Sequence, residues 1–331
     1  MRICHYVAST GLGRGEAYVD LVNELCKHVE IVLLVPKGAL FLPRLNKKIK
    51  VVEYRAKDSR RNPLLLLEIY RHLKAIKPDI VHTHFAKATG IFYRLNKFLK
   101  FPHVATKHNP RKGKIFNRLG NIIAVSDAVR NSIDNKNVTV IYNGIHKEQV
   151  KQVSPNKVFT IRAVGRLDKI KGFDLLISEV AKIDFDFRLE IIGEGDERAN
   201  LEALIQELGL EGQVSLLGFR TDIPDLLASA DLQVMSSLSE GFSLAMIEAI
   251  FYSKVFVSTK VGGCNEVLTS NLLVEDKEIA EKITSVYGDY AFYEDELKKI
   301  RENFLERLEV EKTAEIHVEY YHQLLSGYSR G

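Results

Sequence analysis

Short apolar runs alternate with helical patterns along the first half of this chain. The runs are rich in Val and Ile, and they predict strands at residues 3–8, 31–35, 51–54, 80–83, 104–106, 122–125 and 138–141. Between several of them, apolar residues recur at helical spacing, over residues 16–28, 64–77, 86–99 and 126–133. Alternation of this kind is typical of a parallel sheet with helices on both faces.

The same alternation starts again after residues 143–155. It predicts further strands at residues 159–164, 189–193, 214–216, 232–235 and 255–258, and the chain from residue 276 onward is helical and charged. We therefore expect two doubly wound α/β domains, residues 1–150 and residues 151–310. Ligands of such sheets bind beyond the carboxyl ends of the strands, so we expect the site in a cleft between the domains.

Composition limits the class of protein. The chain has 331 residues, 46% hydrophobic and 27% charged, which is ordinary for a globular protein. Its three cysteines, Cys4, Cys26 and Cys264, are too few and too scattered for a disulfide framework or a zinc site. The first apolar run is too short for a signal peptide, and no apolar stretch reaches the roughly 18 residues of a spanning helix. We expect a cytoplasmic protein.

Charge is divided unevenly between the two halves. Residues 1–150 hold 27 Lys and Arg against 11 Asp and Glu, whereas residues 151–331 hold 20 against 32. A basic first half favours a polyanionic partner, such as anionic lipid headgroups, a phosphorylated glycan or nucleic acid. A solvated basic surface without a partner is the alternative.

Two basic stretches, residues 94–101 and 107–118, thread their charges among Phe, Leu and Ile. Such a mixture suits the plane of an anionic membrane and would also suit stacking on nucleic acid. No nucleic-acid fold signature is present, so we predict binding to the inner face of a membrane or to a phosphorylated lipid-linked acceptor, and no nucleic acid. The basic residues assigned to this surface are Arg94, Lys97, Lys100, Arg111, Lys112, Lys114 and Arg118.

The second half carries the most specific chemistry. Glu240 and Glu248 are separated by seven residues, and upstream a glycine-flanked loop contains Arg166 and Lys171. A helix that starts between the two acids would offer free N–H groups to a phosphate. Two cations and helix amides suit a diphosphate, and carboxylates suit sugar hydroxyls. The combination predicts a nucleotide-sugar site.

These motifs resemble the donor half of the family-4 retaining glycosyltransferases, which have the GT-B fold. The E-x7-E element, the G-R-L-x-x-x-K-G loop at residues 165–172 and the Gly262-Gly263-x-x-Glu266 segment match in the family's order, and the resemblance extends from about residue 11 to about residue 270. It implies two facing Rossmann-like domains, an acceptor-binding first domain, a nucleotide-sugar-binding second domain, and a last helix over residues 311–331 that returns to the first domain.

The resemblance also implies the reaction. A hexose or N-acetylhexosamine would pass from a nucleoside-diphosphate sugar, UDP favoured, to a cell-envelope glycan such as the lipopolysaccharide core or a lipid-linked oligosaccharide, with retention. Arg166 and Lys171 would neutralise the diphosphate, Glu240 would hold donor hydroxyls, and His108 would lie over the donor sugar. No protein base is assigned, because the leaving phosphate is expected to take the acceptor's proton. The other residues implied at the donor are Gly13, Arg14, Gly165, Gly195, Phe219, Arg220, Phe242, Ser243, Leu244 and Glu248.

Three features of the motifs leave alternatives open. Arg14 interrupts the glycine pattern of the family at the first strand–helix turn, which could be a plain turn. His84 is placed at the rim of the cleft or is structural. Asp184 and Asp186 form the one D-x-D near a strand, but they lie in a linker, so we expect no metal ion and no other cofactor.

Two other functions remain possible on the sequence alone. One is a nucleotide-sugar epimerase or an inverting transferase of the same fold. The other is an inactive membrane-binding or nucleic-acid-binding module. The set of Arg166, Lys171, Glu240 and Glu248 argues against loss of the donor site.

Overall fold

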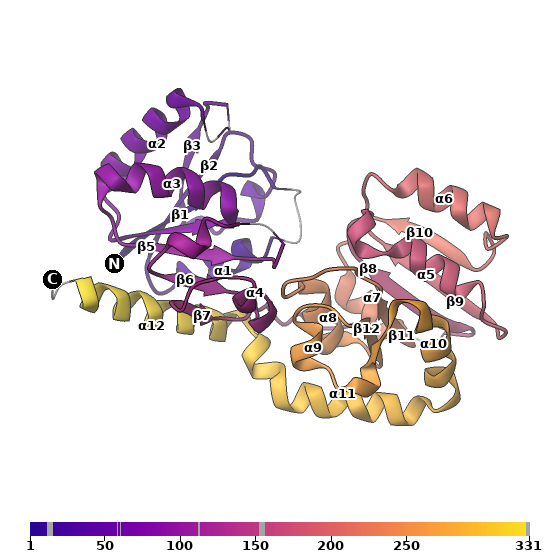
Figure 1. The fold of residues 1–331 in the computed structure, drawn as a ribbon. Helices are drawn as coiled ribbons and strands as arrows, with labels where there is room; N and C mark the ends of the chain where they lie inside the picture. Colours follow the sequence, from indigo (N-terminus) through magenta and orange to yellow (C-terminus); the bar gives the residue numbers. More distant parts are fainter. Residues whose placement is uncertain (12–15, 58, 60, 112, 152–155, 329–331) are drawn as a thin grey trace. The chain divides into compact units, whose positions relative to one another are not determined.

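The computed structural model describes the chain except for residues 12–15, 58, 60, 112, 152–155 and 329–331 (Figure 1). The chain forms two compact units. The first unit contains residues 1–146 together with 307–331, and the second contains residues 147–306. Each unit is described by itself.

The first unit is built on a seven-stranded parallel sheet with the order β3-β2-β1-β4-β5-β6-β7. The strands are β1 (Arg2–Val7), β2 (Glu30–Pro36), β3 (Lys50–Tyr54), β4 (Ile80–His84), β5 (His103–Lys107), β6 (Ile122–Ala124) and β7 (Val138–Val140). The helices are α1 (Ala17–Leu25), α2 (Pro63–Ile76), α3 (Phe85–Leu99), α4 (Asp127–Asn131) and α12 (Val310–Tyr328). The strand order reverses direction between β1 and β4, the place where ligands of open parallel sheets bind.

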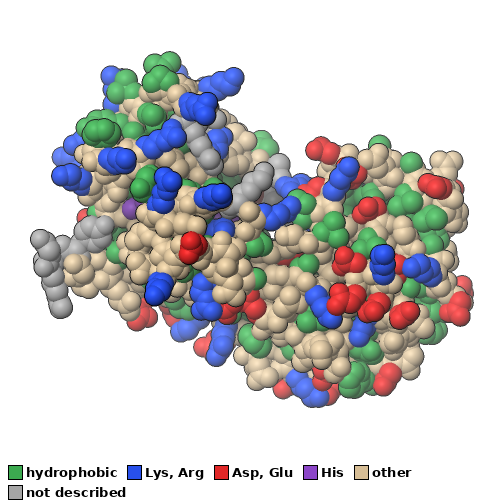
Figure 2. Space-filling view, viewed as in Figure 1, with side chains coloured by type: hydrophobic (Ala, Val, Ile, Leu, Met, Phe, Trp, Pro, Cys, Tyr) green, Lys and Arg blue, Asp and Glu red, His purple; other side chains and the backbone are tan. Residues whose placement is uncertain are grey.

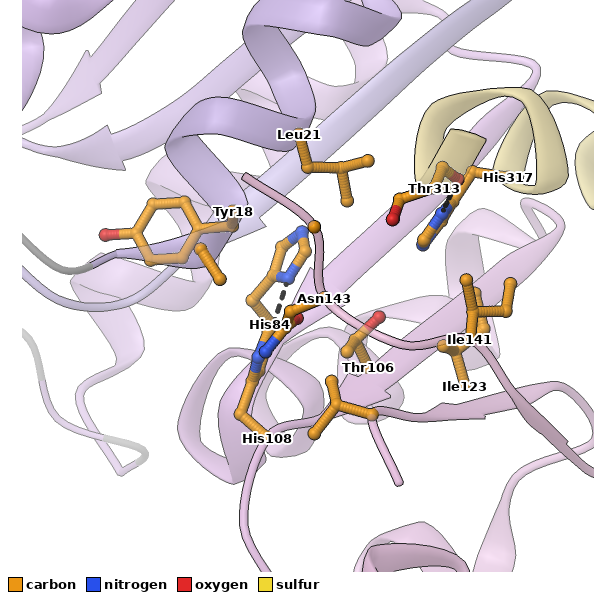
Figure 3. A pocket seen from close by; sticks show the side chains of 13 residues that line it. Tyr18, Leu21, His84, Thr106, His108, Ile123, Ile141, Asn143, Thr313 and His317 are labelled. Atoms are coloured by element: carbon orange, nitrogen blue, oxygen red, sulfur yellow. Dashed lines mark hydrogen bonds between the residues drawn. The ribbon is translucent and has the colours of Figure 1, made fainter. Parts of the chain in front are cut away.

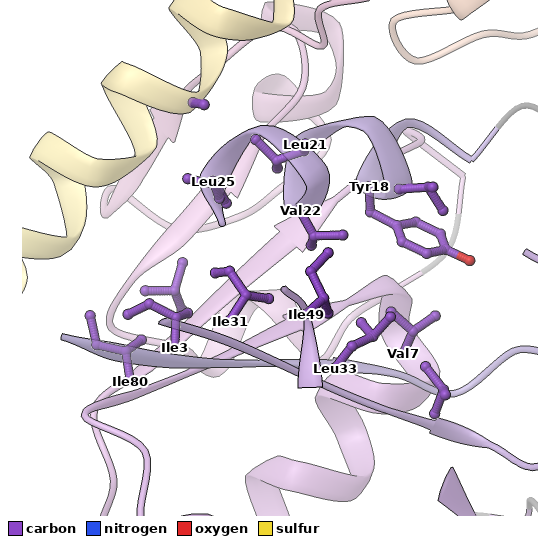
Figure 4. Close-up of a cluster of buried hydrophobic side chains, with 14 of the residues drawn as sticks. Ile3, Val7, Tyr18, Leu21, Val22, Leu25, Ile31, Leu33, Ile49 and Ile80 are labelled. Carbon is purple, nitrogen blue, oxygen red and sulfur yellow. The ribbon is translucent and has the colours of Figure 1, made fainter. Parts of the chain in front are cut away.

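Hydrophobic side chains fill both faces of this sheet. On one face, Tyr6, Tyr54 and Leu34 of the strands pack with the buried sides of α2 and α3. On the other face, Leu25 of α1 joins Ile3 and Ile31 of the strands in a second core (Figure 4). Tyr321 of α12 belongs to the same core. The last helix therefore completes the core of the first unit, although the whole second unit precedes it in the sequence.

The second unit has a six-stranded parallel sheet with the order β10-β9-β8-β11-β12-β13. Its strands are β8 (Phe159–Val164), β9 (Phe187–Ile192), β10 (Val214–Gly218), β11 (Leu232–Met235), β12 (Phe256–Thr259) and β13 (Leu273–Val274). Its α-helices are α5 (Phe173–Val180), α6 (Arg198–Glu207), α7 (Ile223–Ser229), α8 (Leu244–Tyr252), α9 (Cys264–Val267), α10 (Ile279–Gly288) and α11 (Tyr290–Phe304). The order again reverses direction, here between β8 and β11.

The predicted fold class is confirmed. Two parallel-sheet α/β domains are present, and the strands predicted from the apolar runs lie where the runs are. The short strand β13 was not predicted, because two residues are too few to show a period. Within the part of the chain that the structure describes, none of the helices has the length and apolarity needed to cross a bilayer.

Candidate functional site

The loop after β8 carries the predicted cations. The loop ends in a short 3-10 helix, η3 (Lys169–Lys171), and Asp168 is the N-cap residue of this helix. Oδ1 of Asp168 accepts hydrogen bonds from the backbone N–H groups of Ile170 and Lys171, at 3.1 and 3.3 Å. The other oxygen, Oδ2, accepts a hydrogen bond from Nε of Arg166 at 2.6 Å. One carboxylate thus sets the shape of the loop and holds Arg166. Asp168 is not among the residues predicted from the sequence, although an Asp three residues before Lys171 is a helix-cap signal.

Lys171 and Glu240 are brought together although they come from different loops. Nζ of Lys171 donates to Oε1 of Glu240 at 2.7 Å, and the hydroxyl of Ser237 donates to the same oxygen at 2.8 Å. The two charged side chains are only 18% and 13% exposed. Among the described residues, Oε2 of Glu240 has no hydrogen-bond partner and Nζ of Lys171 has two protons unused. The pair can therefore present a carboxylate oxygen and an ammonium to one ligand.

Close backbone contacts hold the loops that carry this pair. At Gly172, with φ of +61°, a Cβ would lie 2.2 Å from the carbonyl oxygen of Ser236. At Gly262, with φ of +36°, a Cβ would lie 2.3 Å from the carbonyl oxygen of Glu240. Only glycine permits both the left-handed backbone and this approach. The loops after β8, β11 and β12 are therefore fixed against one another by their backbones.

The helix α8 starts directly beyond Glu240. Ser243 precedes its first residue, Leu244, and does not cap it with its side chain. The first N–H groups of the helix lack partners within it and carry its partial positive charge. Glu248 lies one turn along α8 and is half-buried, whereas the ring of Phe242 is buried against Gly263. The helix start, Lys171 and Glu240 all lie at the carboxyl edge of the second sheet.

Further predicted donor residues lie at the same edge. Gly165 follows β8, Gly195 approaches the backbone of Leu167, and Phe219 and Arg220 follow β10. Arg220 holds Asp222 with two hydrogen bonds, from Nε to Oδ1 at 2.9 Å and from Nη2 to Oδ2 at 2.6 Å. This guanidinium lowers the pKa of the Asp222 carboxyl. Gly13, Arg14 and Lys112 lie outside the described residues.

In the first unit, His108 follows β5 and is hydrogen-bonded to His84 at the end of β4. Nε2 of His108 lies 3.1 Å from Nδ1 of His84 (Figure 3). His84, expected at the rim of a cleft or in a structural position, is completely buried in the first unit. Burial, with a contribution from His317, lowers the pKa of His108 to about 3, so the imidazole is neutral at physiological pH.

A small cavity lies beside these histidines. It holds about 10 Å³ for the centre of a water molecule, which is enough for one water. Its lining combines apolar residues with polar ones, and the polar ones are Tyr18, His84, Thr106, His108, Asn143, Thr313 and His317 (Figure 3).

The predicted basic surface lies on the first unit. Arg94, Lys97 and Lys100 are exposed on and after α3, as are Arg111, Lys114 and Arg118 on the loop that follows β5. Lys107, which begins the second basic stretch, is instead buried, and its Nζ donates to Oγ of Ser132 at 2.7 Å.

Apolar side chains stand out among these bases. Phe98 on α3 is 77% exposed, and Leu64 and Leu67 are exposed on α2, which packs beside α3. Lys and Arg dominate this unit in the view of Figure 2, with hydrophobic side chains between them, whereas Asp and Glu gather on the second unit. The surface thus combines charge with exposed apolar groups.

The D-x-D pair lies away from the candidate donor site. Asp184 and Asp186 are exposed and precede β9, so they lie at its amino end. The loops with Lys171 and Glu240 lie at the carboxyl ends of their strands, the opposite edge of the same parallel sheet. Between the two acids, Phe185 stacks on Tyr287 with ring centroids 3.9 Å apart.

Two family models match the chain. The model of the glycosyl transferases group 1 matches residues 145–306, and the model of glycosyltransferase family 4 matches residues 15–149. The two matches overlap at residues 145–149 and correspond closely to the second and first units, respectively.

Curated relatives are similar over part or most of their length. An uncharacterised glycosyltransferase of Methanocaldococcus jannaschii is 30% identical over 64% of this chain and 66% of its own length. The N-acetylgalactosamine-N,N'-diacetylbacillosaminyl-diphospho-undecaprenol 4-alpha-N-acetylgalactosaminyltransferase of Campylobacter jejuni is 38% identical, but the match spans only 43% of this chain and 40% of the relative. A lipopolysaccharide core biosynthesis glycosyltransferase of Rhizobium meliloti is 24% identical over 80% of each chain.

A solved structure shares the fold. HepE of Anabaena, crystallised with UDP-glucose, has a TM-score of 0.84 and 21% identity, and the comparison covers 98% of this chain and 100% of that chain. Two parallel-sheet domains in the GT-B arrangement of secondary structure are therefore common to both proteins.

Proposed function

The chain belongs to the group 1 and family 4 glycosyltransferases, whose two models together span residues 15–306, and from this premise we propose that it transfers a hexose or N-acetylhexosamine from a UDP-sugar to a cell-envelope glycan with retention of configuration. The observation that carries the proposal is the Lys171–Glu240 pair at the start of α8. It supplies a cation, a carboxylate oxygen and helix amides within one small region.

The donor's diphosphate suits the positive groups of this region. Arg166 and Lys171 provide fixed charges, and the first N–H groups of α8 suit phosphate oxygens. When the bond to the sugar breaks, negative charge grows on the leaving phosphate. Groups that are already oriented toward that charge stabilise the transition state without reorganisation.

Glu240 suits the sugar. Its Oε1 is held by Lys171 and Ser237, which leaves Oε2 to accept a hydrogen bond from a donor hydroxyl. Glu248, one turn into α8, is assigned to the ribose hydroxyls. His108 of the first unit is neutral and can hydrogen-bond a sugar oxygen. The proton of the acceptor hydroxyl passes to the leaving phosphate, so no protein base takes part.

The acceptor is proposed to be a lipid-linked oligosaccharide or the lipopolysaccharide core. The names of the Campylobacter and Rhizobium relatives support this substrate class. The exposed bases and Phe98 of the first unit support docking on an anionic inner-membrane surface, where such acceptors are found.

Release of nucleoside diphosphate tests the proposal. The full chain is incubated with UDP-, GDP- and ADP-sugars, with undecaprenyl-diphosphate-linked sugar or core lipopolysaccharide as acceptor, and Glu240→Gln serves as the control. Acceptor-dependent release of UDP, with an axial linkage in the product of an axial donor, is the expected result. An altered sugar nucleotide without an acceptor would identify an epimerase, and an inverted linkage would refute retention.

A further inference from the structure

Inside the first unit, four histidines and two hydroxyl groups form a continuous hydrogen-bonded chain. Starting from the surface, Nε2 of His108 lies 3.1 Å from Nδ1 of His84, and Nε2 of His84 lies 2.9 Å from Nδ1 of His5. Nε2 of His5 lies 3.5 Å from the hydroxyl of Tyr321.

The chain continues on the other side of Tyr321. The same hydroxyl lies 2.6 Å from Nδ1 of His82, whose Nε2 lies 2.6 Å from Oγ1 of Thr106. Strand register produces this arrangement: His5 of β1 is paired with His82 of β4, and His84 of β4 is paired with Thr106 of β5. The final helix α12 inserts Tyr321 between the two segments.

The histidine rings in this series of hydrogen bonds are neutral. His5, His82 and His84 are completely buried, and burial lowers the pKa of His5 to about 3 and those of His82 and His84 well below their usual range. A neutral imidazole has one N–H and one lone pair. It can therefore donate on one side only and must accept on the other.

This constraint couples the tautomers. If His108 donates from Nε2, His84 accepts at Nδ1 and must donate from Nε2 to His5, and so on to Thr106. If the direction is reversed, every ring carries its proton on Nδ1. Different tautomers in two rings that contact each other would place two protons or none between their nitrogens. At Tyr321, a mixture would leave either the hydroxyl proton without an acceptor or one buried nitrogen without a donor. Each such unsatisfied buried group is unfavourable.

We propose that these groups act as one tautomeric unit, in which His5, His82, His84 and His108 all carry the proton on the same ring nitrogen. The hydroxyl of Tyr321 couples the tautomer of His5 to that of His82. Tyr321 is then a positioning residue for His108. Among the described residues, Nδ1 of His108 has no hydrogen-bond partner, so it is the open end of the unit.

The tautomeric state of the unit decides whether Nδ1 of His108 donates or accepts a hydrogen bond. With protons on Nε2, Nδ1 of His108 accepts a hydrogen bond, and with protons on Nδ1 it donates one. A ligand oxygen without a proton selects the donor state, and a hydroxyl that donates selects the acceptor state. The identification of this ligand as a sugar oxygen rests on the proposed function, but the coupling itself does not.

A metal site is the competing interpretation of the same residues. Ligand atoms of His5, His82 and His84 lie within 4.8 Å of one another. However, the nitrogens of His82 are occupied by Tyr321 and Thr106, and those of His84 by His5 and His108. A divalent ion would have to break these bonds in a fully buried place, and this group contains no carboxylate to offset its charge.

Nitrogen-15 NMR of the full chain, labelled at histidine and free of substrate, tests the proposal. Two-bond proton–nitrogen correlations distinguish Nδ1–H from Nε2–H in each ring, and single histidine substitutions assign the signals. The expected result is the same tautomer, or the same ratio of the two tautomers, in His5, His82, His84 and His108. Different tautomers among these four rings would overturn the proposal. The same spectra with added Zn²⁺ test the metal interpretation, which predicts shifts at His5, His82 and His84 together.

Tyr321→Phe removes the linking hydroxyl, and Thr106→Val removes the partner of His82 at the far end. Each is expected to change the tautomer ratio of His108, which neither residue bonds. Tyr18→Phe is the control: its ring lies 5.5 Å from that of His84, but its buried hydroxyl has no partner among the described residues. An unchanged ratio in both Tyr321→Phe and Thr106→Val would refute the coupling. Because these spectra need no substrate, a failed transferase assay would not affect their outcome.

Discussion

Nζ of Lys171 lies 2.7 Å from Oε1 of Glu240, and the two residues are 69 positions apart in the sequence. The pair joins the loop after β8 to the loop after β11, and both side chains are largely buried. A charge pair in such a place is a weak source of stability but a sensitive one, since removal of one partner leaves the other uncompensated. This relationship allows its structural and catalytic roles to be separated.

Glu240→Gln and Lys171→Met should each reduce kcat/KM by roughly a hundredfold or more, because each removes a charge that the transition state uses. Each should also lower the free energy of unfolding by about 1–3 kcal/mol. The double variant Lys171→Met/Glu240→Leu should recover much of the stability, since neither charge remains, but not the activity. Urea unfolding and steady-state kinetics measure both. Recovery of activity in the double variant would mean that the pair is purely structural.

Glu248→Ala should weaken donor binding more than turnover. Its expected partner, the ribose, is remote from the bond that breaks, so the loss should be seen as a raised KM for the donor with kcat changed less. Titration with UDP should show the same loss. Glu281→Ala, at an exposed position of α10, is the control. Wild-type affinity for UDP in Glu248→Ala would show that this residue does not bind the nucleotide.

Activity should persist in excess EDTA. The expectation rests on Arg166, Lys171 and the start of α8 as the positive groups at the phosphates, and on the position of Asp184 and Asp186 at the opposite edge of the sheet. The measurement is UDP release with and without chelator. Loss of activity that Mg²⁺ or Mn²⁺ restores would require a metal site and would contradict this prediction.

The first unit should bind anionic vesicles in a salt-dependent way. Replacing Arg94, Lys97 and Lys100 by Glu should weaken binding by roughly a hundredfold or more at low salt, since each base near an anionic surface contributes about fivefold. Phe98→Ser should weaken binding at all salt concentrations, because it removes an apolar contact. Leu208→Ser in the second unit is the matched control. Equal binding of the wild-type protein to neutral and anionic vesicles would show that the basic surface does not recognise anionic lipid. A soluble acceptor would then be the expected partner of this surface.

Stability should fall as the pH drops from about 6.5 toward 4. The folded-state pKa values of His5, His103 and His108 are lowered to about 3 by burial, below the unfolded value near 6.5. Between these values the unfolded chain binds protons that the folded chain does not, so unfolding becomes more favourable as the pH falls. The stabilisation is complete above pH 6.5.

Each such histidine contributes about 1.4 kcal/mol per pH unit in this window. Urea unfolding at pH 7.5, 6.5 and 5.5 measures the slope, and most carboxylates titrate only near pH 4. His103→Gln should reduce this slope by about 1.4 kcal/mol per pH unit, which is the contribution of one proton. A free energy of unfolding that is constant from pH 7.5 to 5.5 would show that these histidines are accessible to protons in the folded state.

Much of the local structure was determined by the sequence. The period of apolar residues identified the strands and the helices between them, because that period reflects burial on one or both faces of an element. The E-x7-E spacing placed Glu240 in a loop and Glu248 on the helix that follows, and the structure has them there. These are relations over a few residues, which the order of residues along the chain fixes directly.

The partners of the functional side chains were decided by the tertiary structure alone. Neither Lys171 with Glu240 nor Tyr321 with His82 can be read from spacing, because strand order and register bring them together. The same applies to Lys107, which the fold buries and brings to Ser132, 25 positions further along the chain. A side chain's neighbours depend on which strands lie side by side, and that choice comes from packing of the whole sheet with its helices, not from any local pattern.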